Sequence, residues 1–163
     1  MITAIIGKAG SGKSTISKLL SGNYDMYVEA DSVVASAYKD DSTKVWFKNH
    51  EILNKAILND CIDKSVLIKI LIQSPYSKYD LENYLYNRYL LPIIHKCRDE
   101  NKSLLVDGIV SRLTKSFDQI ISVEVTEDIR KENLLKRGVS LSRIDEIMEL
   151  QKRNITTAST WLK

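Results

Sequence analysis

The chain has 163 residues, of which 44% are hydrophobic and 28% charged, a size and composition typical of one globular domain that buries roughly 70% of its unfolded surface. Its 24 Lys and Arg residues against 21 Asp and Glu leave a net charge of +3, which argues against a nucleic-acid binder that relies on strong positive charge. No stretch reaches about 18 apolar residues, and Cys61 and Cys97 have neither zinc nor disulfide spacing, so we expect a cytoplasmic protein without a membrane span.

The first forty residues predict two strands, each followed by a helix. A short apolar run opens the chain and is typical of a buried parallel strand. Three glycines follow this run within six residues of one another, and apolar residues then recur at helical spacing. The expected order is strand, glycine-rich turn, helix, strand and helix, over 2–6, 7–12, 13–20, 26–30 and 32–38.

The middle of the chain, from about 43 to 100, has a helical pattern throughout. Two apolar stripes support this prediction, one made of Ile52, Ala56, Ile57 and Cys61 and the other of Leu81, Leu85 and Tyr89. We therefore expect a helical region between the second and third strands of a sheet.

Strand character returns over 103–107 and 119–125, and helices are expected over 127–136 and 140–153. Strands that alternate with helices indicate an α/β fold, a parallel sheet flanked by helices. Four sheet strands are predicted in all, and the composition marks no second domain.

The glycine-rich turn carries the main functional signal. The segment Gly7-Lys8-Ala9-Gly10-Ser11-Gly12-Lys13-Ser14 fits the G-x-x-x-x-G-K-[ST] phosphate loop in full. In such a loop the backbone N–H groups point at an anion, and the following helix adds its positive end. The residues predicted to bind the nucleotide are Lys8, Ala9, Gly10, Ser11, Gly12, Lys13, Ser14 and Thr15.

Two loop side chains have predicted roles in binding ATP and Mg²⁺. Lys13 reaches the β- and γ-phosphates, and the Ser14 hydroxyl binds the metal. Lys8 either touches a phosphate or is solvated. The alternative for the whole segment is a flexible turn without a ligand.

Partner motifs narrow the class of nucleotide-binding protein. No Asn/Thr-Lys-x-Asp guanine motif is present, which argues against a GTPase. The run 104–108 meets only part of the pattern of a Walker B strand. Asp107 therefore either contacts the water shell of the magnesium or ends the strand without a functional role. Small kinases fit the pattern best.

A kinase also needs groups on the acceptor side. Asp31 is expected at the carboxyl end of the second strand, with Glu29 on the same face, where it serves either as base for an acceptor hydroxyl or as cap of the next helix. Arg137 is the predicted cationic clamp on the transferring phosphoryl group. Three further cations lie nearby in the sequence: Arg130, Arg143 and Arg153. For any one of these four arginines, a solvated helix face is the favoured alternative. His50 and His95 are expected to serve packing or lie at the surface.

These motifs resemble the dephospho-coenzyme A kinase family over roughly residues 2–151. The loop 7–15 matches the phosphate loop of the family, and Val28-Glu29-Ala30-Asp31 is similar to its Asp-Ala-Asp motif, whose second acid is the base. Four further segments are similar to family motifs: 62–67 with Ser74-Pro75, Leu91-Pro92-Ile93-Ile94, the strand 104–110, and the stretch 134–151 with Arg137 and Gln151.

The resemblance implies a P-loop NTPase fold with a helical acceptor-binding region at about 43–100 and a lid at about 137–150. It also implies ATP- and Mg²⁺-dependent phosphorylation of the ribose 3′-hydroxyl of dephospho-coenzyme A, the last step of coenzyme A synthesis. Asp31 is then the base rather than a helix cap, and Arg137 belongs to the lid. The partner is a small molecule rather than a nucleic acid or a membrane.

The chain departs from the family at the acceptor side and toward its end. The family continues past Gln151 into a final strand and an Asn-containing loop that help to hold adenine, and this sequence lacks both unless Trp161 or a partner subunit takes their place. The alternatives are a nucleoside or nucleotide kinase and a nucleotide-binding protein without catalysis. The replaced motif positions are Lys8 for Gly, Glu29 for the first Asp, Leu91 for His, and 108–110 for Pro-Leu-Leu.

Overall fold

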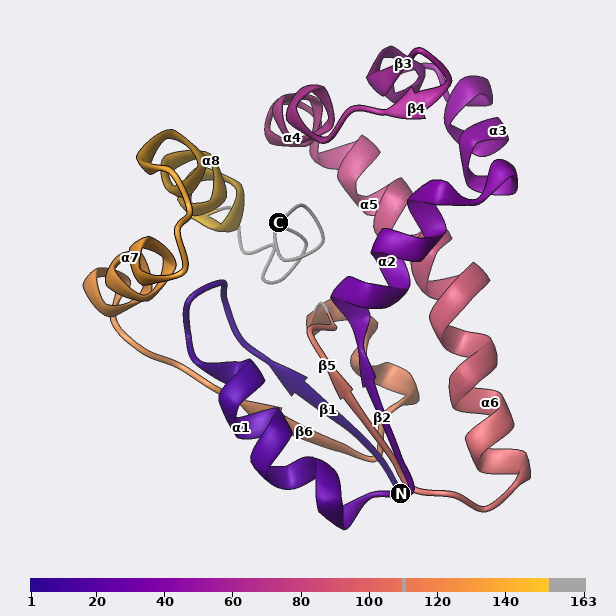
Figure 1. The fold of residues 1–163 in the computed structure, drawn as a ribbon. Coiled ribbons are helices and arrows are strands. Elements are labelled where there is room, and N and C mark those ends of the chain that lie inside the picture. The colour runs from indigo at the N-terminus through magenta and orange to yellow at the C-terminus, as the bar shows by residue number, and fades with distance from the viewer. Residues whose placement is uncertain (110, 153–163) are drawn as a thin grey trace.

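The computed structural model describes residues 1–109 and 111–152, and its centre is a four-stranded parallel sheet (Figure 1). The first four residues of β1 and all four of β5 are buried, as expected of short apolar runs in a covered sheet. The predicted strands are confirmed, although the fourth ends at Ser122 rather than at Val125. In spatial order the strands are β2 (Met26–Glu29), β5 (Leu104–Asp107), β1 (Ile2–Ile6) and β6 (Gln119–Ser122).

The register brings the carboxyl ends of the strands to one edge of the sheet. Ile5 on β1 and Glu29 on β2 both pair with Asp107 on β5. Because open α/β sheets bind ligands at this edge, the residues that follow these strands are the candidates for function.

Helices cover both faces of the sheet. Helix α1 (Lys13–Leu20) starts at the carboxyl edge and runs back along one face, and α6 (Leu91–Asp99) covers the other (Figure 1). Ile94 and Cys97 of α6 pack with alternate residues of the strands, which share one face. These strand residues are Ile2, Ala4, Leu104 and Val106.

Residues 30–99, here called the helical unit, connect β2 to β5, and the core around Phe47, Leu53 and Leu67 also contains Leu150 from near the end of the described residues. Side chains cap its helices: Asp40 accepts from the Ser42 N–H, and Asp63 from the Val66 N–H. The helical pattern predicted for this region is confirmed for most of its length. Its helices are α2 (Ala30–Lys39), α3 (Asp41–Asn49), η2 (Leu53–Ala56), α4 (Lys64–Gln73), α5 (Pro75–Leu85), the π-turn η3 (Tyr86–Leu90) and α6.

The prediction of uninterrupted helix is wrong at a short hairpin. β3 (Ile57–Leu58) and β4 (Cys61–Ile62) pair antiparallel, and Asn59 and Asp60 between them have φ of 51° and 62°. Two residues with positive φ form a turn whose twist suits a hairpin, and Asn and Asp tolerate this conformation best after glycine. The apolar stripe expected on one helix is therefore divided between η2 and this hairpin.

The two histidines have the packing and surface positions expected of them. Nδ1 of His50 accepts hydrogen bonds from the backbone N–H groups of Ile52 and Leu53, and Nε2 lies 3.0 Å from Asp80 Oδ2. His50 thus joins α3 to α5 in the helical unit, and His95 is exposed.

After β5 come the 3₁₀ segment η4 (Ser111–Ser116), β6, and two helices, α7 (Glu127–Lys136) and α8 (Leu141–Lys152), close to the predicted bounds. Gly138, with φ of 80°, turns the chain between the helices. Ala9 of the glycine-rich turn is buried against Leu134 and Ile144, so both helices pack on this turn. None of the helices in residues 1–109 and 111–152 has the length and hydropathy to cross a membrane.

Candidate active site

The phosphate loop connects β1 to α1, as predicted. Gly10 and Gly12 have φ of 80° and 86°, a conformation that glycine adopts without strain. The Ser11 N–H donates to the Lys8 carbonyl oxygen at 3.1 Å, which closes the turn. Lys13 and Ser14 form the first turn of α1, where backbone N–H groups have no partner within the helix and attract an anion.

Helix α7 holds the outer side of this loop. Arg130 Nε donates to the Ala9 carbonyl oxygen at 2.9 Å, and Asn133 Nδ2 donates to the Gly10 carbonyl oxygen at 2.7 Å. With both carbonyl groups held by α7, the loop is fixed with its amide side toward the site. The loop sequence does not predict the contact with Asn133, because Asn133 lies more than one hundred residues further along the chain.

The Arg130 side chain is buried and holds the backbone of the phosphate loop. Its side chain is 6% exposed, and its guanidinium also donates to Gln151 Oε1 on α8. Burial lowers the pKa of Arg130, which the Glu127 carboxylate partly opposes, but a guanidinium stays charged. Of the cations near Arg137 in sequence, Arg130 therefore stabilises the loop backbone, and Arg143 contacts Glu146 on α8 at 3.4 Å.

Replacing Gly10 with alanine is expected to disrupt the loop, because the new Cβ would overlap the Arg130 carbonyl group and force a positive φ on alanine. The positive φ alone costs about 1–2 kcal/mol. Gly22→Ala is the matched control, since a Cβ at Gly22 meets nothing within 4 Å. Chemical denaturation should show a clear loss of stability for Gly10→Ala only, and equal stability of the two variants would contradict this packing.

Lys13 lies at the centre of the candidate site and is 4% exposed. Burial lowers the pKa of Lys13, the negative charges of Asp107 and Asp31 raise it, and the positive charge of Arg137 lowers it again. A Cβ built on Gly108 would lie 3.9 Å from both the Lys13 Cε and the Asp31 Oδ1. Lys13 and Asp31 thus both lie near Gly108, and the charges of Asp107 and Arg137 are near enough to Lys13 to shift its pKa.

Asp31 lies in a helix rather than at a strand end. Helix α2 begins at Ala30, and its N-cap is Glu29, which has extended φ and ψ of −90° and 115° and makes no side-chain cap bond. The predicted helix start at Ser32 is therefore wrong, and so is the alternative that Asp31 caps this helix. Asp31 sits in the first turn, where the helix dipole stabilises a negative charge.

Asp107 ends β5 and is 5% exposed. The Tyr27 hydroxyl lies 3.4 Å from Asp107 Oδ2, whereas Asp107 Oδ1 is buried without a hydrogen-bond partner among the described residues. Sequence reasoning missed Tyr27, although residues 27 and 29 share a face of β2 and the parallel register places this face beside Asp107. A hydroxyl at Ser14 and a buried carboxylate oxygen at Asp107 are donors of the kind that Mg²⁺ prefers.

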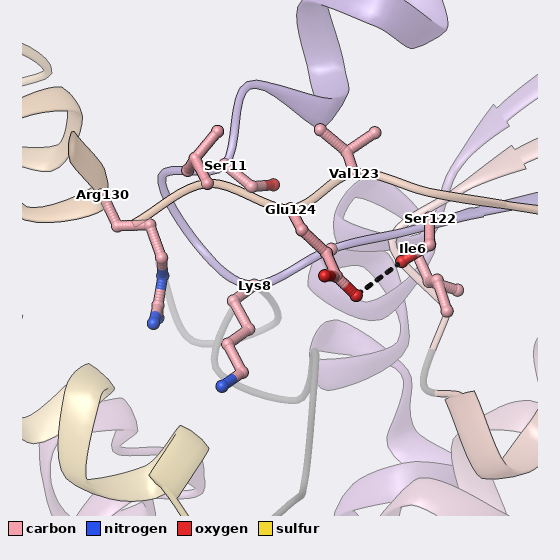
Figure 2. Close-up of a pocket in the computed structure, with 9 residues that line it drawn as sticks. Ile6, Lys8, Ser11, Ser122, Val123, Glu124 and Arg130 are labelled. Carbon is pink, nitrogen blue, oxygen red and sulfur yellow. Dashed lines mark hydrogen bonds between the residues drawn. The ribbon is translucent and has the colours of Figure 1, made fainter. Parts of the chain in front are cut away.

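A cavity of about 440 Å³ lies between the loop and the segment after β6 (Figure 2). Ile6, Val123 and Val125 line it, together with the half-buried Lys8. The Ser122 hydroxyl donates to Glu124 Oε1 at 3.4 Å, and the Lys8 side chain extends from the loop with its ammonium pointing away from this pair (Figure 2). The segment 153–163, which includes Arg153 and Trp161, lies outside the described residues.

Comparison with known proteins identifies relatives of this loop and fold. An adenylate kinase of Azobacteroides pseudotrichonymphae genomovar. CFP2 is 27% identical over 167 residues, which cover 93% of this chain and 74% of the relative. An alpha-factor-transporting ATPase of Candida albicans (strain WO-1) is 39% identical over 54 residues, 33% of this chain and 4% of the transporter. This chain thus spans only a small part of the transporter's length.

Among solved structures, the crystal structure of TT1252 from Thermus thermophilus is similar with a TM-score of 0.68 and 19% identity, over 96% of this chain and 85% of that chain. This likeness is one of fold. An AAA domain family matches residues 4–154, a span that contains the phosphate loop, Asp31, Asp107 and Arg137. This chain therefore has the P-loop NTPase fold and belongs to the AAA domain family.

Proposed function

We propose that this protein is an ATP-dependent kinase that phosphorylates the ribose 3′-hydroxyl of dephospho-coenzyme A. The observation that carries the proposal is that Lys13, at the end of the phosphate loop, and Asp31 both lie near Gly108, which follows β5. A buried ammonium stabilises a transferring phosphoryl group, and a carboxylate beside it accepts the proton of the attacking hydroxyl. The adenylate kinase relative, aligned over 93% of this chain, supports the kinase class.

In the proposed reaction the acceptor oxygen attacks the γ-phosphorus in line with the bond to the leaving ADP oxygen, which breaks. Asp31 orients the acceptor hydroxyl and takes its proton. Lys13 and the amides of the loop hold the β- and γ-phosphates, and the exposed Arg137 neutralises charge that develops on the phosphoryl group.

The Ser14 hydroxyl and the Asp107 carboxylate are the groups proposed to hold Mg²⁺, directly or through water. Bound Mg²⁺ neutralises charge on the β- and γ-phosphate oxygens. The cavity beside Lys8 is a suitable place for the base and ribose of the nucleotide, because Ile6, Val123 and Val125 give it apolar walls.

Two features support dephospho-coenzyme A as the acceptor. Residues 28–31 are similar to the acidic motif of the dephospho-coenzyme A kinase family, and Asp31 of this motif lies beside Lys13. The helical unit begins at this position and offers a long acceptor more surface than a nucleoside uses. The similarity to an adenylate kinase favours a second candidate acceptor, a nucleoside monophosphate.

The acceptor is tested with purified protein, ATP and Mg²⁺ by following ADP release. The panel is dephospho-coenzyme A, AMP, CMP, UMP, dTMP and the corresponding nucleosides, each with a control lacking acceptor. We expect ADP release that depends on dephospho-coenzyme A. NMR of the product should show the new phosphate at the ribose 3′ position. If only a nucleoside monophosphate supports ADP release, the acceptor is the second candidate and not dephospho-coenzyme A. ATP binding without acceptor-dependent ADP release would indicate a non-catalytic nucleotide-binding protein.

A further inference from the structure

We propose that Tyr27 is a positioning residue for the divalent cation that accompanies the nucleotide: its hydroxyl holds one oxygen of Asp107, so that the other oxygen is directed to the cation site. This inference rests on the proposed function, because it concerns the metal bound with ATP. It assigns a role to a side chain outside the phosphate loop and the acceptor motif.

Tyr27 lies between α1 and two carboxylates. Its hydroxyl is 3.4 Å from Asp107 Oδ2 and 3.4 Å from Glu29 Oε1. Burial and the charges of Asp107 and Glu29 raise the pKa of Tyr27, and a hydrogen bond with Ser17 partly offsets this. A phenol, with an ordinary pKa of about 10, is protonated at neutral pH and is a donor, here with one proton for two carboxylates.

The burial of the two carboxylates decides which of them receives this proton. Glu29 is exposed, so water can hydrate its oxygens, whereas Asp107 is 5% exposed. A buried carboxylate without a donor has lost hydration that an exposed carboxylate keeps, so the hydrogen bond contributes more at Asp107. We conclude that Tyr27 donates to Asp107 Oδ2.

The hydrogen bond from Tyr27 to Asp107 Oδ2 leaves the other carboxylate oxygen, Oδ1, for the cation. Asp107 Oδ1 is buried and has no hydrogen-bond partner among the described residues, while the Lys13 ammonium is close enough for the Asp107 charge to raise its pKa. The bond from the phenol to Oδ2 restricts rotation of the carboxylate and leaves Oδ1 as the oxygen available to a cation. Groups that orient a metal-binding carboxylate typically contribute about 10–100-fold to metal affinity.

The test is the gain in ATP affinity that Mg²⁺ produces, measured by calorimetry with Mg²⁺ and again with EDTA. Tyr27→Phe is expected to reduce this gain about tenfold and to leave the affinity in EDTA unchanged. In the kinase assay the same variant should raise the KM for Mg²⁺ more than it lowers kcat at saturating Mg²⁺.

Tyr24→Phe is the matched control, because the Tyr24 hydroxyl hydrogen-bonds Thr3 Oγ1 at 3.0 Å, away from the carboxylates. A second test combines Tyr27→Phe with Asp107→Asn. If Tyr27 acts through Asp107, the double variant and Asp107→Asn alone show the same Mg²⁺-dependent gain in ATP affinity. Equal behaviour of Tyr27→Phe and Tyr24→Phe, or additive losses in the double variant, would overturn the proposal.

Two outcomes separate this inference from the proposed function. Wild-type protein that shows the Mg²⁺ gain but does not phosphorylate dephospho-coenzyme A disproves the acceptor and leaves the role of Tyr27 intact, because the calorimetric test needs no acceptor. Wild-type protein that binds ATP equally with Mg²⁺ and EDTA overturns the role of Tyr27, since no cation then depends on Asp107.

Discussion

Replacement of Lys13 by methionine is expected to reduce kcat by about 1,000-fold or more, while ATP affinity falls much less. The Lys13 ammonium is 4% exposed, so its charge acts through protein rather than through bulk water. Such a charge contributes most when negative charge shifts toward the leaving oxygen in the transition state. Methionine keeps the unbranched stem, so the loss reflects the ammonium and not a cavity.

Two measurements make the Lys13 result specific. Lys18→Met changes an exposed lysine of the same helix and should leave kcat unchanged. Thermal unfolding of Lys13→Met reports whether Asp31 and Asp107 tolerate the loss of the neighbouring positive charge. A folded Lys13→Met variant with kcat near the wild-type value would show that phosphoryl transfer does not occur at this loop.

The sequence predicts the bounds of those helices and strands whose apolar residues follow a regular spacing. The apolar runs of β1 and β5 and the helical spacing in α1, α7 and α8 predicted bounds close to those observed. The hairpin at 57–62 was missed because strands of two residues are too short for an alternating pattern, and its turn is Asn59-Asp60 without a glycine. The start of α2 was missed because Glu29 precedes it without a Ser, Thr, Asp or Asn cap signal.

The candidate site was predictable where one motif contains it and not where distant segments meet. The phosphate loop motif predicted Lys13 and Ser14, since the spacing of the glycines fixes the local backbone. The hydrogen bonds from Arg130 and Asn133 to the loop carbonyl groups depend on how α7 packs, which no local pattern encodes. Arg130 therefore looked like a free cation in the sequence and is in fact part of the loop's support.

Replacement of Asp31 by asparagine is expected to lower kcat by about 100-fold or more and to change ATP affinity little, because a general base contributes about 10²–10⁴-fold to a proton transfer. The amide keeps the size of the carboxylate but cannot take the acceptor proton. Asp41→Asn is the matched control, since both residues lie in the first turn of a helix and lose a similar interaction with the helix dipole, about 0.3–1 kcal/mol.

The comparison of these two variants separates catalysis from helix stability. If Asp31 is the base, only Asp31→Asn loses turnover. In chemical denaturation Asp31→Asn is expected to lose more stability than Asp41→Asn, because the Asp31 charge also lies near the Lys13 ammonium. Normal turnover by Asp31→Asn would rule out its carboxylate as the base, and the buried Asp107, whose charge also raises the pKa of Lys13, would then be tested in that role. Because Asp107 is also proposed to hold the cation, Asp107→Asn would in that case lose both turnover and the Mg²⁺ gain in ATP affinity.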